Sequence, residues 1–225
     1  MINLSAYDFS VVYKNIDVLA IGYKFTLLVF VITAGSAFFT GTLLALLRIA
    51  KPLFIKIPVA AYISVFRCTP ALVQLAWIYF VIPALTGIPL TAFTGALLAC
   101  GLRATAFYGE AIRLGLQAIP KEQLDAAKSI GLSWIQRQRY VIVPQAARMA
   151  FPVIVTNMIG TLQQTSLVST IAVPDLMYQG QLLTSLLFKP VEILTVVALM
   201  YLALTVPLAR LGDYLEEKWR TRVGG

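Results

Sequence analysis

The sequence predicts an all-α membrane protein with five transmembrane helices, and three observations support this fold class. Apolar residues make up 59% of the 225 residues and charged residues only 12%, whereas a soluble domain has about 45–50% and about 25%. The mean hydropathy is +0.82. Long charge-free stretches alternate with short basic ones. A chain with so few charges cannot cover a surface that faces water, so we expect it in a membrane.

Five segments are long and apolar enough to cross a bilayer, which takes about 20 mostly apolar residues. They are residues 21–47, 59–82, 90–116, 149–168 and 191–211. Arg67 and Pro70 interrupt the second segment, and Arg103, Glu110 and Arg113 lie in the later half of the third. We expect residues 1–225 to form a single transmembrane domain.

The basic residues of the connections predict the orientation, because cytoplasmic loops carry an excess of Lys and Arg. These residues are frequent after the first and third segments and in the C-terminal tail. Residues 83–89 have none, and the connection before the fifth segment has only Lys189. We therefore expect the N-terminus outside and the C-terminus in the cytoplasm, as five spans require. This distribution accounts for the net charge of +8 without nucleic-acid binding.

The connection formed by residues 118–145 is unusually long and predicts two short helices. Pro120 suits the first position of a helix, and Gly131 suits the left-handed residue that ends one. Ser133 and Gln136 have the spacing of a capping box, which would begin the second helix. On periodicity alone, an amphipathic hairpin lying on the membrane surface is an equally good interpretation.

Two groups of residues resemble the permease subunits of ABC importers. Asp125-Ala126-Ala127 with Gly131 after it, and Val141-Ile142-Val143-Pro144, resemble the EAA loop of that family, with Asp125 and Val143 in place of Glu and Leu. Residues 66–75, Phe-Arg-Cys-Thr-Pro-Ala-Leu-Val-Gln-Leu, resemble a segment of the polar amino acid group, which serves histidine, glutamine, arginine, cystine and opines. Further matches extend the resemblance over about residues 20–215: Glu110 with Arg113, Ile119-Pro120, and Asn157 with Thr165-Ser166-Leu167.

The resemblance implies a fold like that of type I ABC importer permeases, in the plasma (inner) membrane of a bacterium. The function implied is the ATP-driven import of a polar amino acid, with cystine, glutamine, arginine and histidine as the candidates. The implied partners are a cytoplasmic ABC ATPase dimer, a second copy or a related permease, and an extracytoplasmic amino acid-binding protein that could contact residues 171–176. Membrane lipid surrounds the helices.

The EAA loop of the family couples the permease to its ATPase. By resemblance, the residues in this role are Gln123, Leu124, Asp125, Ala126, Ala127, Ile130, Gly131 and Leu132. The small residues permit a close backbone approach, and Leu124 and Ile130 can serve as apolar anchors. The chain lacks a Gly-rich phosphate loop followed by Lys and Ser or Thr, so we expect no enzymatic activity and no cofactor of its own. ATP and Mg²⁺ would bind to the partner ATPase.

Polar residues inside the predicted spans are candidates for the substrate path. They are Arg67, Thr69, Gln74, Asn157, Gln163, Gln164, Thr165 and Ser166. Each has a structural alternative. Arg67 could extend to the membrane interface or pair with Glu110 instead of binding a substrate carboxylate, and the polar residues of the fourth span could join helices by hydrogen bonds. Gln163 and Gln164 stand where the family usually has Lys and Asp, which puts any charge contact there in doubt.

The histidine and cysteine content limits the kinds of site that the chain can form. The sequence has no His, so His-based metal sites and general bases are excluded, and we expect no metal site. Cys68 and Cys100 lie in apolar stretches and are expected to be buried free thiols.

A stand-alone secondary carrier is the rival interpretation. Such carriers usually have internal repeats and intramembrane acids, but we find no clear repeat, and Glu110 is the only acid deep in the first four spans.

Overall fold

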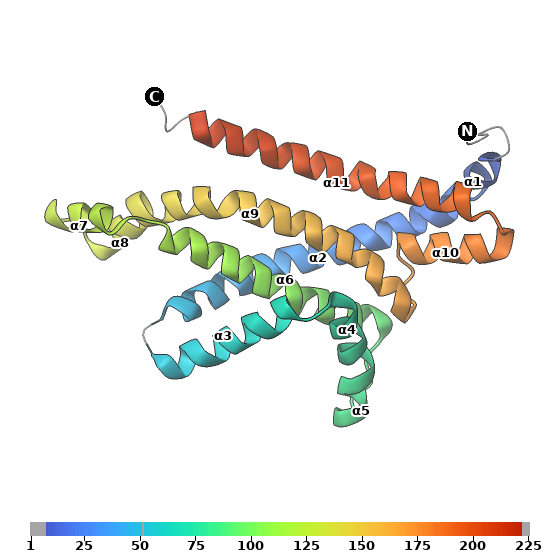
Figure 1. Cartoon of the computed structure of the whole chain (residues 1–225), viewed down its shortest axis with the longest axis horizontal. Helices are drawn as coiled ribbons and strands as arrows, with labels where there is room; N and C mark the ends of the chain where they lie inside the picture. Colours follow the sequence, from blue (N-terminus) through green and yellow to red (C-terminus); the bar gives the residue numbers. More distant parts are fainter. Residues whose placement is uncertain (1–7, 51, 222–225) are drawn as a thin grey trace. The chain divides into compact units, whose positions relative to one another are not determined.

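The structure, a computed structural model, describes residues 8–50 and 52–221. Within these ranges every regular element is a helix and no strand occurs (Figure 1), which confirms the all-α prediction. The elements are α1 (Ser10–Lys14), α2 (Ile16–Ile49), α3 (Leu53–Cys68), α4 (Ala71–Ala76), η2 (Trp77–Val81), α5 (Ile82–Thr86), α6 (Ala92–Gln117), α7 (Lys121–Ser129), α8 (Trp134–Arg137), η3 (Gln138–Ile142), α9 (Val143–Gln164), η4 (Thr165–Ile171), α10 (Leu176–Leu187) and α11 (Pro190–Thr221). Of these, η2 and η3 are π-helical and η4 is a 3-10 helix.

Three helical stretches in the described part of the chain are long and apolar enough to cross a membrane. They are Ile16–Ile49, Trp134–Ile171 and Pro190–Lys218, and the broken pair Leu53–Cys68 and Ala71–Thr86 qualifies when taken together. Helix α6 has 26 residues but contains Arg103, Glu110 and Arg113. Each of the five predicted segments lies in these helices, apart from residues 69–70 and 90–91. The count of five crossings and their orientation stay predictions.

The chain divides into two compact units. Among the described residues, one unit combines those up to Ala34 with Pro70–Gly101 and Gly160–Pro207, and the other combines those of 35–69, Leu102–Ile159 and those from Leu208 onward. The core of the first unit comes from α1, α2, α10 and α11 and consists of Val12, Leu19, Leu176, Leu183, Ile193 and Val197. The core of the second unit comes from α2 and α6 and consists of Ala37, Ala104 and Tyr108. The single-domain assignment stays a prediction.

The end of α3 shows how a helix break is accommodated in an apolar segment. Pro70 disfavours helical geometry at Thr69, which is extended at φ −104° and ψ 148°. A break frees backbone carbonyls, and these need partners where water is excluded. Arg103 of α6 donates from Nη1 to the carbonyl oxygens of Phe66 at 2.8 Å and Thr69 at 3.2 Å. The guanidinium therefore stabilises the end of α3.

Candidate functional site

The helix pair α7–α8 follows α6 and precedes η3 and α9, and it lies at the end of those long helices (Figure 1). Both predicted end signals are confirmed. Gly131 has φ +76°, and its N–H donates to the carbonyl of Lys128 at 2.9 Å. The Ser133 hydroxyl accepts from the Gln136 N–H at 3.3 Å, and the Gln136 side chain accepts from the Ser133 N–H at 2.8 Å. The loop is therefore a defined helical hairpin.

Large apolar side chains are exposed on this hairpin. Ile130 is 75% exposed, Trp134 66% and Ile135 69%, whereas Ala127 is buried and Leu124 and Leu132 are half-buried. The other four residues predicted for coupling are exposed: Gln123, Asp125, Ala126 and Gly131. Trp134 and Ile135 were not among the residues predicted for coupling. Their place directly after the N-cap Ser133, in the first turn of a helix, is the signal that could have identified them.

Two charged residues of α7, Asp125 and Lys128, are exposed and paired with each other. Lys128 Nζ donates to Asp125 Oδ1 at 2.7 Å. This hydrogen bond and the positive charge of Lys128 hold the pKa of Asp125 below its usual value, so the carboxylate is ionised at neutral pH. An exposed pair of this kind contributes little to stability. Both side chains can exchange this contact for one with another protein.

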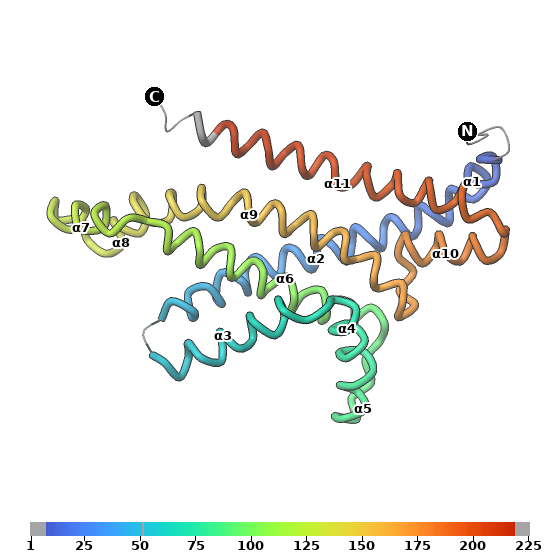
Figure 2. The backbone as a smooth tube through the Cα atoms, in the orientation of Figure 1, coloured from blue at the N-terminus to red at the C-terminus, as the bar shows by residue number. Residues whose placement is uncertain are grey.

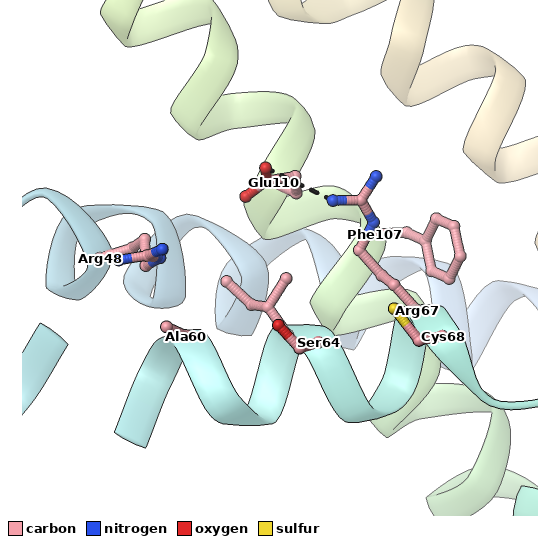
Figure 3. Close-up of a pocket in the computed structure, with 8 residues that line it drawn as sticks. Arg48, Ala60, Ser64, Arg67, Cys68, Phe107 and Glu110 are labelled. Atoms are coloured by element: carbon pink, nitrogen blue, oxygen red, sulfur yellow. Dashed lines mark ion pairs between the residues drawn. The ribbon is translucent and has the colours of Figure 1, made fainter. Parts of the chain in front are cut away.

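The second unit also contains a cavity of about 360 Å³ between α2, α3 and α6 (Figure 3). Its lining residues are Arg48, Ala60, Ile63, Ser64, Arg67, Cys68, Phe107 and Glu110. Both cysteines were predicted to be buried free thiols. That prediction is wrong for Cys68, which is exposed at this cavity, whereas Cys100 is buried. The difference arises because α3 ends at Cys68, beside the break, whereas Cys100 lies within α6.

Ion pairs to Glu110 determine how the charged side chains of the cavity lie. Arg67 Nη1 lies 3.4 Å from Glu110 Oε1, and the Arg67 side chain is 42% exposed. Arg113 binds the same carboxylate with two donors, Nη2 to Oε1 at 2.6 Å and Nε to Oε2 at 2.8 Å. The Arg67 guanidinium also lies 5.6 Å from the centre of the Phe107 ring. Arg113 thus holds Glu110 firmly, while Arg67 is the looser partner.

The polar residues predicted for the substrate path lie partly in one unit and partly in the other. In the second unit, Asn157 donates from Nδ2 to the Phe107 carbonyl at 3.2 Å, a contact that joins α9 to α6. In the first unit, α4 contacts η4, which places the buried Gln74 on a helix adjacent to the one that Thr165 begins. Gln163 is exposed and Thr165 is buried. The hydroxyls of Thr165 and Ser166 donate to the carbonyls of Leu162 and Gln163.

Comparison with known proteins identifies the family. Residues 37–221 match the family described as the binding-protein-dependent transport system inner membrane component. The chain is 33% identical over 211 residues to the probable glutamine ABC transporter permease protein GlnM of Bacillus subtilis, covering 93% of this chain and 96% of that one. It is 31% identical over 216 residues to the arginine transport system permease protein ArtQ of the same organism, covering 95% and 98%.

Solved structures agree with this assignment. A crystal structure of an amino acid ABC transporter with histidines superposes with a TM-score of 0.87 at 30% identity, covering 94% of this chain and 98% of that one. An inward-facing MetNI methionine ABC transporter shares the fold, with a TM-score of 0.74 at 18% identity over 91% of this chain and 97% of that one. The chain therefore belongs to the family of inner membrane components of binding-protein-dependent transport systems, and it is a multi-pass membrane permease of the amino-acid ABC transporter type.

Proposed function

We propose that this chain is the membrane subunit through which an ATP-driven importer moves a polar amino acid into the cell, with glutamine, arginine, histidine and cystine as the candidates. The observation that carries the proposal is the helical hairpin α7–α8, which exposes Ile130, Trp134 and Ile135 on a chain without a phosphate-binding loop. Exposed aromatic and aliphatic residues on a rigid element are typical anchors of a protein interface. The partner is a cytoplasmic ABC ATPase, which would bind ATP and Mg²⁺.

Coupling follows from the shape of the hairpin. The exposed Ala126 and Gly131 let the partner's backbone approach closely, while Ile130 and Trp134 insert apolar side chains. The salt bridge between Asp125 and Lys128 supplies charges that fix the register. Closure of an ATPase dimer on ATP would move α7, and α6 and α9 would transmit that movement into the membrane. A second permease copy or a related permease completes the path, and an extracytoplasmic binding protein delivers the amino acid.

The charged cavity suits a zwitterion. Arg67, the looser partner of Glu110, can turn to the substrate carboxylate, while Glu110 accepts hydrogen bonds from the substrate ammonium group and stays bound to Arg113. Glu110 then never remains as an unpaired charge in a poorly solvated place, which would be costly. Phe107 offers an apolar surface beside Arg67. Thr69, Gln74, Asn157 and residues 163–166 would form the rest of the path.

Affinity purification of the tagged chain from native membranes in mild detergent tests the proposed assembly. Mass spectrometry should identify an ATPase with a phosphate-binding loop, and a related permease alongside it would indicate a heterodimer. A stable preparation of this chain alone, together with uptake driven by an ion gradient, would favour a secondary carrier and contradict the proposal.

Uptake of radiolabelled L-glutamine, L-arginine, L-histidine and L-cystine tests the substrate class. Loss of a hydrogen bond to a charged group costs about 1.5–3 kcal/mol, so Arg67→Gln should raise the apparent KM of the transported amino acid by about 10- to 100-fold. Arg148→Gln is the matched control, because Arg148 is exposed and lies outside the cavity. An unchanged KM in Arg67→Gln would exclude Arg67 as the carboxylate ligand.

A further inference from the structure

The segment η4 is an unusually long 3-10 helix. It has seven residues, Thr165–Ile171, whereas 3-10 runs of more than about three or four residues are uncommon. Four hydroxyls, those of Thr165, Ser166, Ser169 and Thr170, donate to the carbonyl three residues earlier at 2.6 to 2.8 Å. The segment ends at Ala172, which has φ 60°, a left-handed conformation that is unfavourable for any residue with a Cβ. The surroundings therefore hold η4 in this form.

Asp175 fixes the chain directly after η4, where it turns into α10 (Figure 2). Its side chain is fully buried. Oδ1 accepts from the Tyr178 N–H at 2.9 Å, and Oδ2 accepts from the Met177 N–H at 3.3 Å. The Tyr201 hydroxyl of α11 donates to Oδ2 at 3.1 Å. The side chain of Thr165, at the other end of η4, interacts with the same hydroxyl.

Helix α2 completes this arrangement. The Thr26 hydroxyl accepts from the Leu176 N–H at 3.1 Å, and Thr26 also interacts with the Tyr201 hydroxyl. At Gly22, a Cβ would lie only 2.8 Å from the carbonyl oxygen of Asp175, so only glycine permits this close approach. Three helices, α2, α10 and α11, are thus tied to the chain at Asp175.

The form of η4 decides where the polar residues before it lie. A 3-10 helix rises about 2.0 Å and turns about 120° per residue, and an α-helix rises about 1.5 Å and turns about 100°. Relaxation of seven residues to α-helix would shorten the segment by about 3.5 Å and rotate its start by about 140°. Gln163 and Gln164 directly precede η4, and Thr165 and Ser166 begin it. Their position relative to Asp175 therefore depends on which helix η4 adopts.

We propose that Asp175 is a positioning residue for transport: its hydrogen bond from Tyr201 keeps η4 in the 3-10 form and so places Gln163–Ser166 for the amino acid. This inference rests on the proposed function, because it takes these four residues as part of the substrate path. Asp175 itself does not touch the substrate. It acts through η4, by joining the end of that segment to α2, α10 and α11.

Uptake kinetics of the four radiolabelled amino acids in cells with the complete transporter test this role. A bond worth about 1.5 kcal/mol shifts the competent population about tenfold, so Tyr201→Phe and Asp175→Asn should each raise the apparent KM about tenfold. The double variant should resemble Tyr201→Phe, because that change removes the donor of the bond that Asp175→Asn weakens by replacing the carboxylate with a neutral amide. Tyr178→Phe is the control, since Tyr178 contacts Asp175 through its backbone N–H, and its KM should stay within about twofold.

A thiol at position 163 gives a second readout that assembly alone would not change. In a Cys68→Ser, Cys100→Ser background, the Gln163→Cys variant should react with a maleimide at a rate that changes at least severalfold when Tyr201→Phe is added. Unchanged reactivity, with a lower maximal uptake at constant KM, would show a purely structural role and overturn the inference. Should the wild type transport none of the four probes, the proposed function would fail, and the labelling rates would still decide the role of Asp175.

Discussion

Gly131 offers the sharpest test of the coupling hairpin. It has φ +76°, and a Cβ built there meets nothing within 4 Å. An L-residue in this conformation costs about 1–2 kcal/mol, so Gly131→Arg strains the end of α7 without colliding with its own chain. If an ATPase seats against α7, the arginine side chain must displace it. We expect uptake to fall at least tenfold, and the ATPase to be lost on purification.

Two variants separate strain from collision with the partner. Gly131→Ala carries the same left-handed strain with almost no bulk, so it should keep most of the uptake. Gly87→Arg is matched in geometry, because Gly87 ends α5 with φ +72° and also has nothing within 4 Å. It lies on the connection predicted to be outside, so this variant should keep its ATPase.

The assay measures the ratio of ATPase to permease after affinity purification, together with uptake per assembled permease. We expect the ATPase and the uptake to be lost in Gly131→Arg alone. Equal ratios and equal uptake in Gly131→Arg and the wild type would refute the assignment of α7 as the coupling helix.

Three further predictions concern the cavity, the packing and the buried acid. A membrane-impermeant maleimide should modify Cys68 and spare the buried Cys100, and the transported amino acid should slow the reaction; equal labelling with and without it would place the substrate elsewhere. At Gly115, where a Cβ would lie 2.6 Å from the Ala146 carbonyl, leucine should destabilise the protein by about 1–3 kcal/mol in a thermal unfolding assay; an unchanged melting temperature would contradict the α6–α9 contact. Burial raises the pKa of Asp175 to about 6, whereas an Asp in the unfolded chain has a pKa of about 3.9. The contribution of Asp175 to the free energy of unfolding is therefore complete below about pH 4 and is lost as the pH rises through 6. The loss amounts to roughly 3 kcal/mol. Asp175→Asn should therefore raise the melting temperature at pH 7.5 and reduce its change between pH 4.5 and 7.5; an unaltered pH dependence would refute the raised pKa.

The sequence predicted local features well. The helix end at Gly131 and the capping box of Ser133 and Gln136 each depend on contacts between residues three or four apart, and the structure confirms both. The pair of Glu110 and Arg113 is equally local, since residues three apart share one face of a helix. The membrane class followed from composition, which needs no three-dimensional information.

Contacts between distant segments could not be predicted in the same way. The donation from Arg103 to the carbonyls of Phe66 and Thr69 joins two helices, and no periodicity encodes it. In the sequence Cys68 is an ordinary apolar position, because only the three-dimensional structure shows that it is exposed beside the break after α3. Asp175 was assigned only to an outer segment, because Tyr201, which donates to it, and Thr26, which binds the neighbouring Leu176 N–H, lie on α11 and α2, far away in the sequence.

Uptake by the purified complex in lipid vesicles tests the central claim most directly. Radiolabelled L-glutamine, L-arginine, L-histidine and L-cystine are offered with the binding protein on one side and ATP on the side of the ATPase. We predict that at least one amino acid accumulates only when ATP can be hydrolysed, and that a non-hydrolysable ATP analogue abolishes the accumulation. Accumulation without ATP, driven by an ion gradient across this chain alone, would contradict it.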